Sequence, residues 1–557
     1  RMPPLRFFSV FHLLLRKNCR IIILHFFRMC YNAFMDILIQ NVTVLDGSGA
    51  PAYAGAIGME NGKLRMFKPC EAAALSAEAT IDGTGLTAVP GFIDAHSHGD
   101  LTMRGVYATA SKITQGITTQ VAGQCGFSMF PCAPDPASYE QFTRFISRVA
   151  PYPEMPDKPE VCQSAASFFD WMRSLNSPVK TYSFTGLGSL RLWAMGYADR
   201  KPDATELRRM QDMLRRSIRE GSLGLSTGLV YAPCVYADNE EILALLRVVH
   251  EEGGMYATHP RNEADHVIDA RRESIRLAKE ADVPLCVSHL KTAGRDNWGK
   301  SKTLLEDIDR ALDDGMELLI DCYPYMAGNT SLNVSIPPRY FSDGLPGLVA
   351  ALRSPVERER IREEMQHKSN YDNYLYNSGG FSGTYVSSCP VFHDAEGMFI
   401  TEYAEKAGLD PFDAYADILI RNNGLGLGIY FHMCEDDVVR IFSHPLCAVS
   451  TDGLVGLPNE NPHPRSFGTM PRAFRLLTDE HHICGIPEAI HRMTGLAAEK
   501  LRLKGKGFLR DGYDADVLLL DLPHFRDTST YANGSARTTG IRRIFVSGQE
   551  VNMEVYQ

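Results

Sequence analysis

The sequence contains 13 cysteines in 557 residues, yet no two of them form a CxxC pair. Their number is odd and they are scattered along the chain, so a dense disulfide framework is not expected. This pattern favours a reducing compartment, and we predict a cytoplasmic protein. The sequence also lacks an internal repeat of 20–50 residues and a G-x-G-x-x-G dinucleotide fingerprint.

The chain has no excess of positive charge. Lys and Arg number 57 against 67 Asp and Glu, which leaves a formal net charge of −10. An obligate nucleic-acid-binding protein usually shows a basic face, so no nucleic-acid partner is predicted. Hydrophobic residues make up 44% and charged residues 22% of the chain, which is ordinary globular composition and excludes global disorder.

The first 34 residues contain no Asp or Glu and differ from the rest of the chain. Their two apolar runs, Phe7–Leu15 and Ile21–Phe27, are each too short to span a bilayer, and Arg16 and Lys17 separate them. We predict that residues 1–34 are an extension outside the fold, with a targeting peptide as the alternative and a membrane anchor as the weakest one. No membrane partner is predicted.

The distribution of short strands predicts how the rest of the chain is organised. Residues 36–89 and 500–557 are both rich in short strands and tight turns, including an Asn61-Gly62 hairpin turn. We therefore predict one small β-sandwich domain built from both chain ends. Strands and helices alternate from about residue 90 to 323, and we predict a separate catalytic barrel domain at residues 90–499.

Eight buried strands are predicted in this middle region, several of them as near-continuous apolar runs. They are Ala88–Ile93, Thr118–Val121, Thr181–Phe184, Leu223–Ser226, Met255–Thr258, Leu285–Ser288, Glu317–Cys322 and Ala448–Thr451. Eight strands with helices between them favour an α/β fold of the (β/α)8 TIM-barrel type, with a doubly wound sheet as the alternative. The long gap after the seventh strand predicts an insertion at about 326–440.

Metal-binding side chains stand at the ends of five of these strands. They are His96 and His98 after the first strand, Cys125 after the second, His259 after the fifth, His289 after the sixth and Asp452 after the eighth. Each residue alone is unremarkable, but barrel active sites lie at the C-terminal ends of the strands. Together these residues offer the nitrogen, sulfur and oxygen donors that suit zinc.

The motifs around these residues resemble the amidohydrolase superfamily and, within it, the D-aminoacylases, which are N-acyl-D-amino-acid deacylases. The likeness covers almost everything after Met35. The matching segments include residues 90–98, Cys125 with Gly126-Phe127-Ser128, 224–229, 258–263, 288–291 with 297–300, Tyr323-Pro324-Tyr325 and 462–465. Cys125 stands where most amidohydrolases have a carboxylated lysine, which separates the chain from hydantoinases and dihydroorotases.

The resemblance implies a role for each of these positions. Cys125, His259 and His289 would hold one tight Zn²⁺ ion, and His96, His98 and Asp452 would line a second, weaker metal position. Asp452 would also be the general acid and base. Lys291, Tyr323 and Arg465 would bind the substrate carboxylate, with Arg465 best suited to a planar two-pronged contact.

The implied reaction is the hydrolysis of a small-molecule N-acyl-D-amino acid to a carboxylate and a free D-amino acid. Zinc would activate water and polarise the amide, while Asp452 would move the proton to the leaving amine. Two alternatives stay open at this point: another amidohydrolase acting on cyclic or linear amides, and a catalytically inactive scaffold on the same fold. The chain is expected to be a monomer or a small homo-oligomer.

Overall fold

The structure is a computed structural model and describes residues 35–72, 75–102, 105–368, 370–455, 457–458 and 460–556. The extension predicted at residues 1–34 lies outside the described residues. Within the described ranges, no helix combines the length and the apolar character that a bilayer crossing requires.

Parallel strands in the middle of the chain form a barrel, which confirms the predicted fold class. The strands are β6 (Phe92–Asp94), β7 (Ile117–Ala122), β8 (Lys180–Ser183) continued by β9 (Thr185–Gly186), β10 (Gly224–Gly228), β11 (Met255–His259), β12 (Leu285–Val287), β13 (Leu318–Cys322) and β18 (Cys447–Val449). Phe184 separates β8 from β9, and these two short strands together occupy one strand position of the barrel. The barrel closes where Ala95 N, just after β6, donates to Val449 O in β18 at 3.4 Å.

Helices cover the outside of the barrel between successive strands. They include α8 (Ala204–Arg219), α9 (Asn239–Glu251), α10 (Val267–Ala281) and α11 (Ser301–Asp313). Helix α8 begins with a capping box, in which the Asp203 side chain accepts from the N–H groups of Thr205 and Glu206. Its Met210 and Leu214 side chains are fully buried, because they lie on the apolar face that packs toward the strands.

The first predicted strand, Ala88–Ile93, is wrong as a single element. It divides into β5 (Thr87–Pro90), which pairs with β1 (Met35–Val44) and β19 (Val517–Leu520), and β6, which pairs with β7 in the barrel. Gly91 lies at the division, where a Cβ atom would come within 2.1 Å of Thr118 Oγ1. The chain therefore passes from one sheet to the other at a point where only glycine fits.

Strands from both chain ends share one eight-stranded sheet, in the order β21-β20-β19-β5-β1-β2-β3 with β4 beside β1. The remaining members are β2 (Tyr53–Glu60), β3 (Lys63–Phe67), β4 (Ala77–Asp82), β20 (Ile541–Val546) and β21 (Gln549–Glu550). Asn61 and Gly62 join β2 to β3 with positive φ angles of 52° and 74°, which confirms the predicted hairpin turn. We propose that residues 36–89 and 500–557 form a domain around this sheet.

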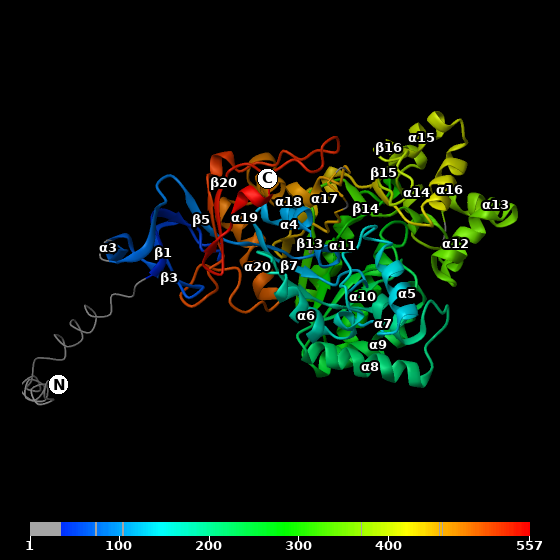
Figure 1. The fold of residues 1–557 in the computed structure, drawn as a ribbon, viewed down its shortest axis with the longest axis horizontal. Helices are drawn as coiled ribbons and strands as arrows, with labels where there is room; N and C mark the ends of the chain where they lie inside the picture. The colour runs from blue at the N-terminus through cyan, green and yellow to red at the C-terminus, as the bar shows by residue number, and fades with distance from the viewer. Residues whose placement is uncertain are drawn as a thin grey trace, which may run out of the picture.

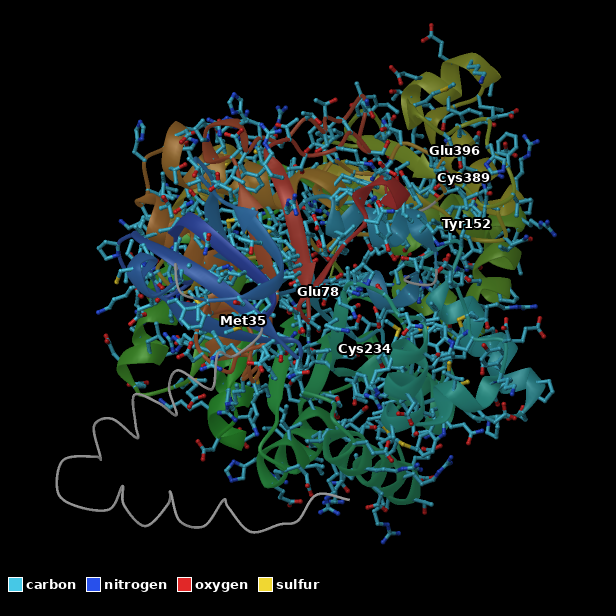
Figure 2. The ribbon with its side chains drawn as sticks, turned by 60° about the vertical axis from the view of Figure 1, so that its left-hand side comes forward. Met35, Glu78, Tyr152, Cys234, Cys389 and Glu396 are labelled. Carbon is cyan, nitrogen blue, oxygen red and sulfur yellow. The ribbon has the colours of Figure 1, made fainter. Side chains whose placement is uncertain are left out.

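The long segment after β13 folds as a layer of its own. Its strands β14 (Ala327–Ser331), β15 (Thr384–Ser388), β16 (Met398–Phe399) and β17 (Leu427–Phe431) make an antiparallel sheet, with α12 (Gly344–Arg353), α13 (Pro355–Met365), α14 (Tyr374–Asn377), α15 (Ile400–Ala407) and α16 (Pro411–Arg421) around it. Figure 1 shows this insertion at one end of the molecule and the sheet of the chain ends at the other. In Figure 2, Met35 marks that sheet, while Cys389 and Glu396 mark the insertion.

Candidate metal centre and substrate pocket

The barrel brings the six predicted metal-binding residues together at the C-terminal ends of its strands. His259 is the last residue of β11, and Cys125, His289 and Asp452 follow β7, β12 and β18 by two or three residues. His96 and His98 lie two and four residues beyond the end of β6. Both are buried, and their ring centroids are 5.6 Å apart.

Four of these residues form one compact set of donors. The donor atoms of His96, Cys125, His289 and Asp452 all lie within 4.8 Å of one another. Cys125 Sγ is 3.2 Å from His289 Nε2 and 3.4 Å from His96 Nε2. Donors that share a tetrahedral zinc ion are separated by about 3.3–3.8 Å, given bond lengths of about 2.0–2.3 Å. The spacing and chemistry of this set therefore fit a zinc ion.

His259 and His98 stand at the two sides of this set. His259 Nδ1 is 3.0 Å from His289 Nε2 and belongs to a second donor group, made of His259, Glu263 and His289. His98 Nε2 is 3.3 Å from Asp452 Oδ1. Within the predicted trio, Cys125 Sγ and His259 Nδ1 each contact the same atom, His289 Nε2. A zinc ion bound by all three residues stays a prediction.

Unusual backbone angles turn several donors into the barrel. Cys125, His289 and Asp452 have φ angles of 53°, 31° and 44°, in the left-handed region that non-glycine residues seldom adopt. The turn at Cys125 also needs glycine beside it, because a Cβ atom on Gly228 would lie 1.9 Å from Cys125 O. Such conformations persist where the surrounding structure fixes them, and they cluster at functional sites.

Burial and charge set the protonation of the donors. Burial raises the pKa of the Cys125 thiol well above its usual value, so this thiol needs a cation beside it to ionise. Burial alone would also raise the pKa of Asp452, but the guanidinium of Arg465 and the neighbouring imidazoles hold it well below its usual value. Asp452 is therefore a carboxylate at neutral pH, able to bind a metal or accept a proton.

Two buried carboxylates behind the imidazoles were missing from the sequence prediction. Glu263 Oε1 lies 3.1 Å from His289 Nδ1, and Asp321 Oδ2 lies 3.4 Å from His96 Nδ1. A carboxylate at Nδ1 favours the tautomer whose proton is on Nδ1, which leaves Nε2 free to bind a metal. Lys291 Nζ also lies 2.6 Å from His289 Nδ1, and a hydrogen bond from it would require an unprotonated Nδ1. A metal ion at Nε2 would favour the other tautomer, in which Nδ1 carries the proton and donates to Glu263.

Replacing Glu263 with Gln should weaken metal binding. The amide keeps the size of the side chain but loses the charge that orients His289, and removing such a partner typically costs 10–100-fold in metal affinity. Competition with a chelator of known affinity measures the change. Glu273→Gln is the matched control, because Glu273 lies on α10 and pairs with Arg261. Equal metal affinity in all three proteins would show that Glu263 does not support the centre.

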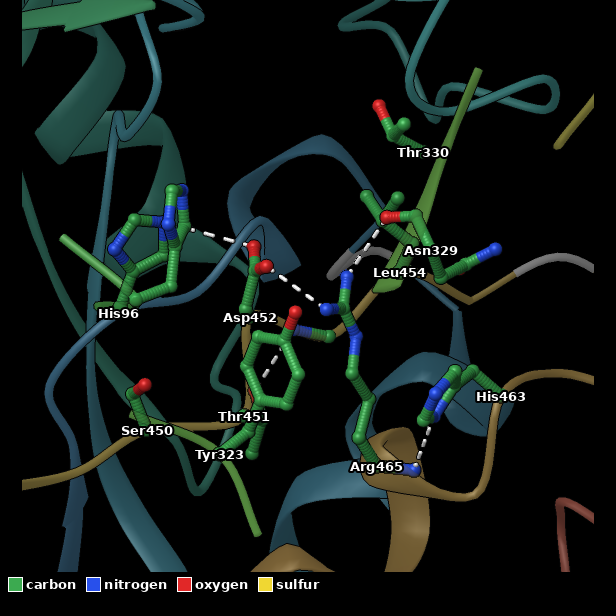
Figure 3. A network of polar contacts seen from close by, with 12 residues as sticks. His96, Tyr323, Asn329, Thr330, Ser450, Thr451, Asp452, Leu454, His463 and Arg465 are labelled. Carbon is green, nitrogen blue, oxygen red and sulfur yellow. Dashed lines mark hydrogen bonds and ion pairs between the residues drawn. The ribbon is translucent and has the colours of Figure 1, made fainter. Parts of the chain in front are cut away.

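The predicted carboxylate-binding residues lie in the same pocket, but each cation already has an acidic partner. Arg465 Nη1 donates to Asp452 Oδ2 and Nη2 donates to Asn329 O, both at 2.8 Å, as Figure 3 shows. Lys291 Nζ donates to Glu263 Oε1 at 2.7 Å. The Arg465 guanidinium stacks 4.6 Å from the centroid of the Tyr323 ring. A substrate carboxylate would therefore have to share or replace these contacts.

His463, in the loop just before helix α18 (Arg465–Arg475), fixes the position of Arg465. It is fully buried, and its Nδ1 accepts from Arg465 N at 3.0 Å while Nε2 lies 2.9 Å from Ala327 O. The second contact joins this loop to strand β14 of the insertion. The insertion therefore helps to place the guanidinium beside Asp452.

Two segments match the spacing of motifs from other enzyme classes, and the structure gives both a different role. Residues 294–301 read G-x-x-x-x-G-K-S, as in phosphate-binding loops, but Gly299 N and Ser301 Oγ both donate to Asp437, whose carboxylate fills that position. Residues 224–228 read G-x-S-x-G, as in serine hydrolases. Ser226 lies inside β10 and its hydroxyl donates to a backbone carbonyl, so it has no nucleophilic geometry.

No protein-family model matches the chain. The chain is 31% identical over 520 residues to N-acyl-D-aspartate deacylase of Alcaligenes xylosoxydans xylosoxydans, covering 93% of this chain and 92% of that protein. It is 29% identical to D-aminoacylase of the same organism, with coverage of 93% and 95%. Among solved structures, the chain resembles N-acyl-D-glutamate deacylase from Bordetella bronchiseptica, with a TM-score of 0.77 and 30% sequence identity. The match covers 93% of this chain and 96% of that chain. That structure is complexed with zinc and a phosphonate inhibitor that mimics the tetrahedral intermediate.

Proposed function

The chain belongs to the N-acyl-D-amino-acid deacylase family of the amidohydrolases, and we propose that it uses zinc at its barrel mouth to hydrolyse N-acyl-D-amino acids. The observation that carries this proposal is the compact donor set of His96, Cys125, His289 and Asp452, with Arg465 in contact with Asp452. A scaffold without catalytic function would not need these buried, mutually close donors, whose burial is costly without a ligand.

We propose one tight zinc position, held by Cys125, His259 and His289, and a weaker metal position lined by His96, His98 and Asp452. Zinc in such a site supplies Lewis acidity, which polarises an amide carbonyl and makes water acidic near neutral pH. The contact of His289 Nε2 with both Cys125 and His259 supports the first grouping, and the contact of Asp452 with both His96 and His98 supports the second.

Asp452 is the proton carrier in this proposal. Its carboxylate is ionised, lies among the metal donors and is held by Arg465 Nη1 at 2.8 Å. It would accept a proton from the attacking water and deliver it to the amide nitrogen, so that the amine leaves in neutral form. Positioned proton transfer of this kind contributes typically 10²–10⁴-fold to the rate.

Arg465, Tyr323 and Lys291 form the proposed binding group for the α-carboxylate. The Tyr323 ring has the Arg465 guanidinium at 4.6 Å and Lys291 Nζ at 5.7 Å from its centroid, so both cations lie around one aromatic side chain. An anion held here would be oriented relative to the metal donors through the contact between Arg465 and Asp452. This orientation would determine which enantiomer presents its amide to the metal.

Replacing Arg465 with Ala tests the substrate class. KM for N-acetyl-D-amino acids should rise about 10- to 100-fold, because charge-assisted hydrogen bonds to a carboxylate are lost. The kcat should fall as well, since Asp452 loses the partner that positions it. Arg465→Lys should rescue only in part, because an ammonium cannot make two parallel contacts.

Steady-state kinetics on both variants measure these effects, with Arg475→Ala as a control in the last turn of α18 (Arg465–Arg475). If Arg465→Ala hydrolyses N-acetyl-D-amino acids as well as the parent protein does, the α-carboxylate is not bound there. A neutral or cyclic amide would then be the better substrate class.

The state of the cysteines bears on location. Every cysteine in the described part of the chain is a free thiol, including buried ones such as Cys162 and Cys286. Free thiols suit a reducing compartment, and we propose a cytoplasmic location on this basis. A monomer or small homo-oligomer stays the expected assembly.

A further inference from the structure

His432 is a buried pocket residue that the proposed chemistry does not use. It follows strand β17 of the insertion, lines the pocket at the metal donors and is 2% exposed. Among the residues that the structure describes, neither of its ring nitrogens has a hydrogen-bond partner. Most buried polar side chains are paired, and leaving one unpaired is costly, so an imidazole of this kind indicates a ligand group that it would contact.

The backbone around His432 holds the ring in place. His432 O accepts from Gly294 N at 2.7 Å and from Trp298 Nε1 at 3.1 Å, which ties the insertion to the loop after β12. The Tyr374 ring packs against the imidazole, with centroids 5.5 Å apart. Burial, together with the charge of Lys291, lowers the pKa of His432 to about 3, so the imidazole is neutral with one donor and one acceptor.

Gly328 of strand β14 lies directly against the imidazole of His432. A Cβ atom at this position would lie 2.9 Å from His432 Nε2 and 3.6 Å from Tyr323 Oη. Gly328, Tyr323 and His432 line the same pocket, although neither ring nitrogen of His432 has appreciable exposed surface. Because glycine has no side chain, β14 makes no side-chain contact with Nε2 at this position, and a substrate group would have to enter beside Gly328 to reach the imidazole.

The pocket presents polar as well as apolar groups. Its lining includes Lys291, Arg465 and Asn329 together with apolar side chains such as Phe127 and Leu454, with the metal donors beside them. An aliphatic side chain placed against His432 would leave its ring nitrogens desolvated and unpaired. A side chain that carries its own hydrogen-bonding oxygen atoms would pair with them instead.

We propose that His432 is a specificity residue that hydrogen-bonds a carboxylate or carboxamide on the side chain of the D-amino-acid part of the substrate. This inference rests on the proposed function. The scissile carbonyl must lie at the metal donors and the α-carboxylate beside Arg465, all of which follow barrel strands. The acyl chain and the amino-acid side chain are the two arms of the substrate that remain. His432 and Tyr374 come from the insertion, and because an acetyl chain offers no polar atom to an imidazole, the amino-acid side chain is the arm that pairs with them.

Substrate preference of the metal-loaded protein tests the proposal. N-acetyl-D-glutamate, N-acetyl-D-glutamine and N-acetyl-D-leucine are compared in the parent protein, His432→Met and His432→Gln. In the parent protein, kcat/KM should be higher for the two polar substrates than for the leucine derivative. His432→Met should lower kcat/KM for the two polar substrates about 10- to 100-fold more than for the leucine derivative, because a hydrogen bond to a polar or charged group is lost.

His432→Gln should retain part of the preference, since its amide can still donate and accept. His524→Met is the control, because His524 is an exposed histidine outside the pocket. Its replacement should leave the substrate preference unchanged. Thermal-shift titration with free D-glutamate and D-leucine gives a second readout independent of turnover. D-glutamate should stabilise the parent protein more than D-leucine does.

An equal effect of His432→Met on all three substrates, or no effect, would overturn the proposal, because a structural residue or one that contacts the α-carboxylate would not discriminate between side chains. A parent protein that prefers the leucine derivative would overturn it as well, even if His432→Met does not fold. If the parent protein hydrolyses none of the three, the proposed function itself fails, which is a different outcome.

Discussion

Cys125→Ala should lose its tightly bound zinc, and its hydrolysis of N-acetyl-D-amino acids should fall to the background rate. The Cys125 sulfur lies 3.2 Å from His289 Nε2 and 3.4 Å from His96 Nε2, so it contacts one member of each proposed metal position. A thiolate is also the one negatively charged sulfur donor in the set, and alanine offers no replacement. Elemental analysis after dialysis, together with an activity assay, measures both losses.

Cys162→Ala is the matched control for this variant. Cys162 is also a fully buried free thiol, in the short helix Pro159–Gln163, and it belongs to neither donor group found among the described residues. Both variants lose the same atom from a packed interior, so a small loss of stability should be common to both. If Cys125→Ala keeps a full equivalent of zinc, the cysteine is not a ligand and the proposed tight site is wrong.

Asp452→Asn should lower kcat by about 10²–10⁴-fold while KM changes much less, as expected for the removal of a general base. The amide has the same shape as the carboxylate but cannot accept and return a proton. The tight zinc should remain, because the proposed tight ligands are Cys125, His259 and His289. The measurement is therefore kcat per bound zinc ion, with zinc determined on the same sample.

Asp307→Asn provides the comparison, because Asp307 is a buried carboxylate on α11 that pairs with Arg272, on the outer side of the barrel. It should keep both kcat and zinc. An Asp452→Asn protein that retains zinc and most of its kcat would assign the proton transfer to another group. Glu263 would then be the next carboxylate to test, since it contacts His289, His259 and Lys291.

The positions of the metal donors could be predicted because the ends of buried strands can be recognised in the sequence. Apolar runs such as 255–258 and 285–288 mark buried strands, and a barrel places whatever follows them at one rim. His259 and His289 are therefore brought together by the fold itself. The mistake at Ala88–Ile93 arose because one apolar run continues across Gly91, where the chain changes sheet.

Residues that support the donors were harder to find. Glu263 stands four residues after His259, in an irregular segment with no periodic pattern, and Tyr374 lies on a short helix within the long insertion. Asp321 did leave a signal, because a carboxylate inside the buried strand Leu318–Cys322 is costly unless it has partners. His432 left no such signal in the sequence, because its role depends on how the insertion folds over the barrel.

Chirality of the released product tests the central claim most directly. The zinc-loaded protein is incubated with racemic N-acetylmethionine and racemic N-acetylglutamate, and the free amino acids are separated on a chiral column. We expect that D-amino acids alone are released, at a rate that follows the zinc content of the sample. Release of L-amino acids, or no release from either racemate by fully zinc-loaded protein, would contradict it.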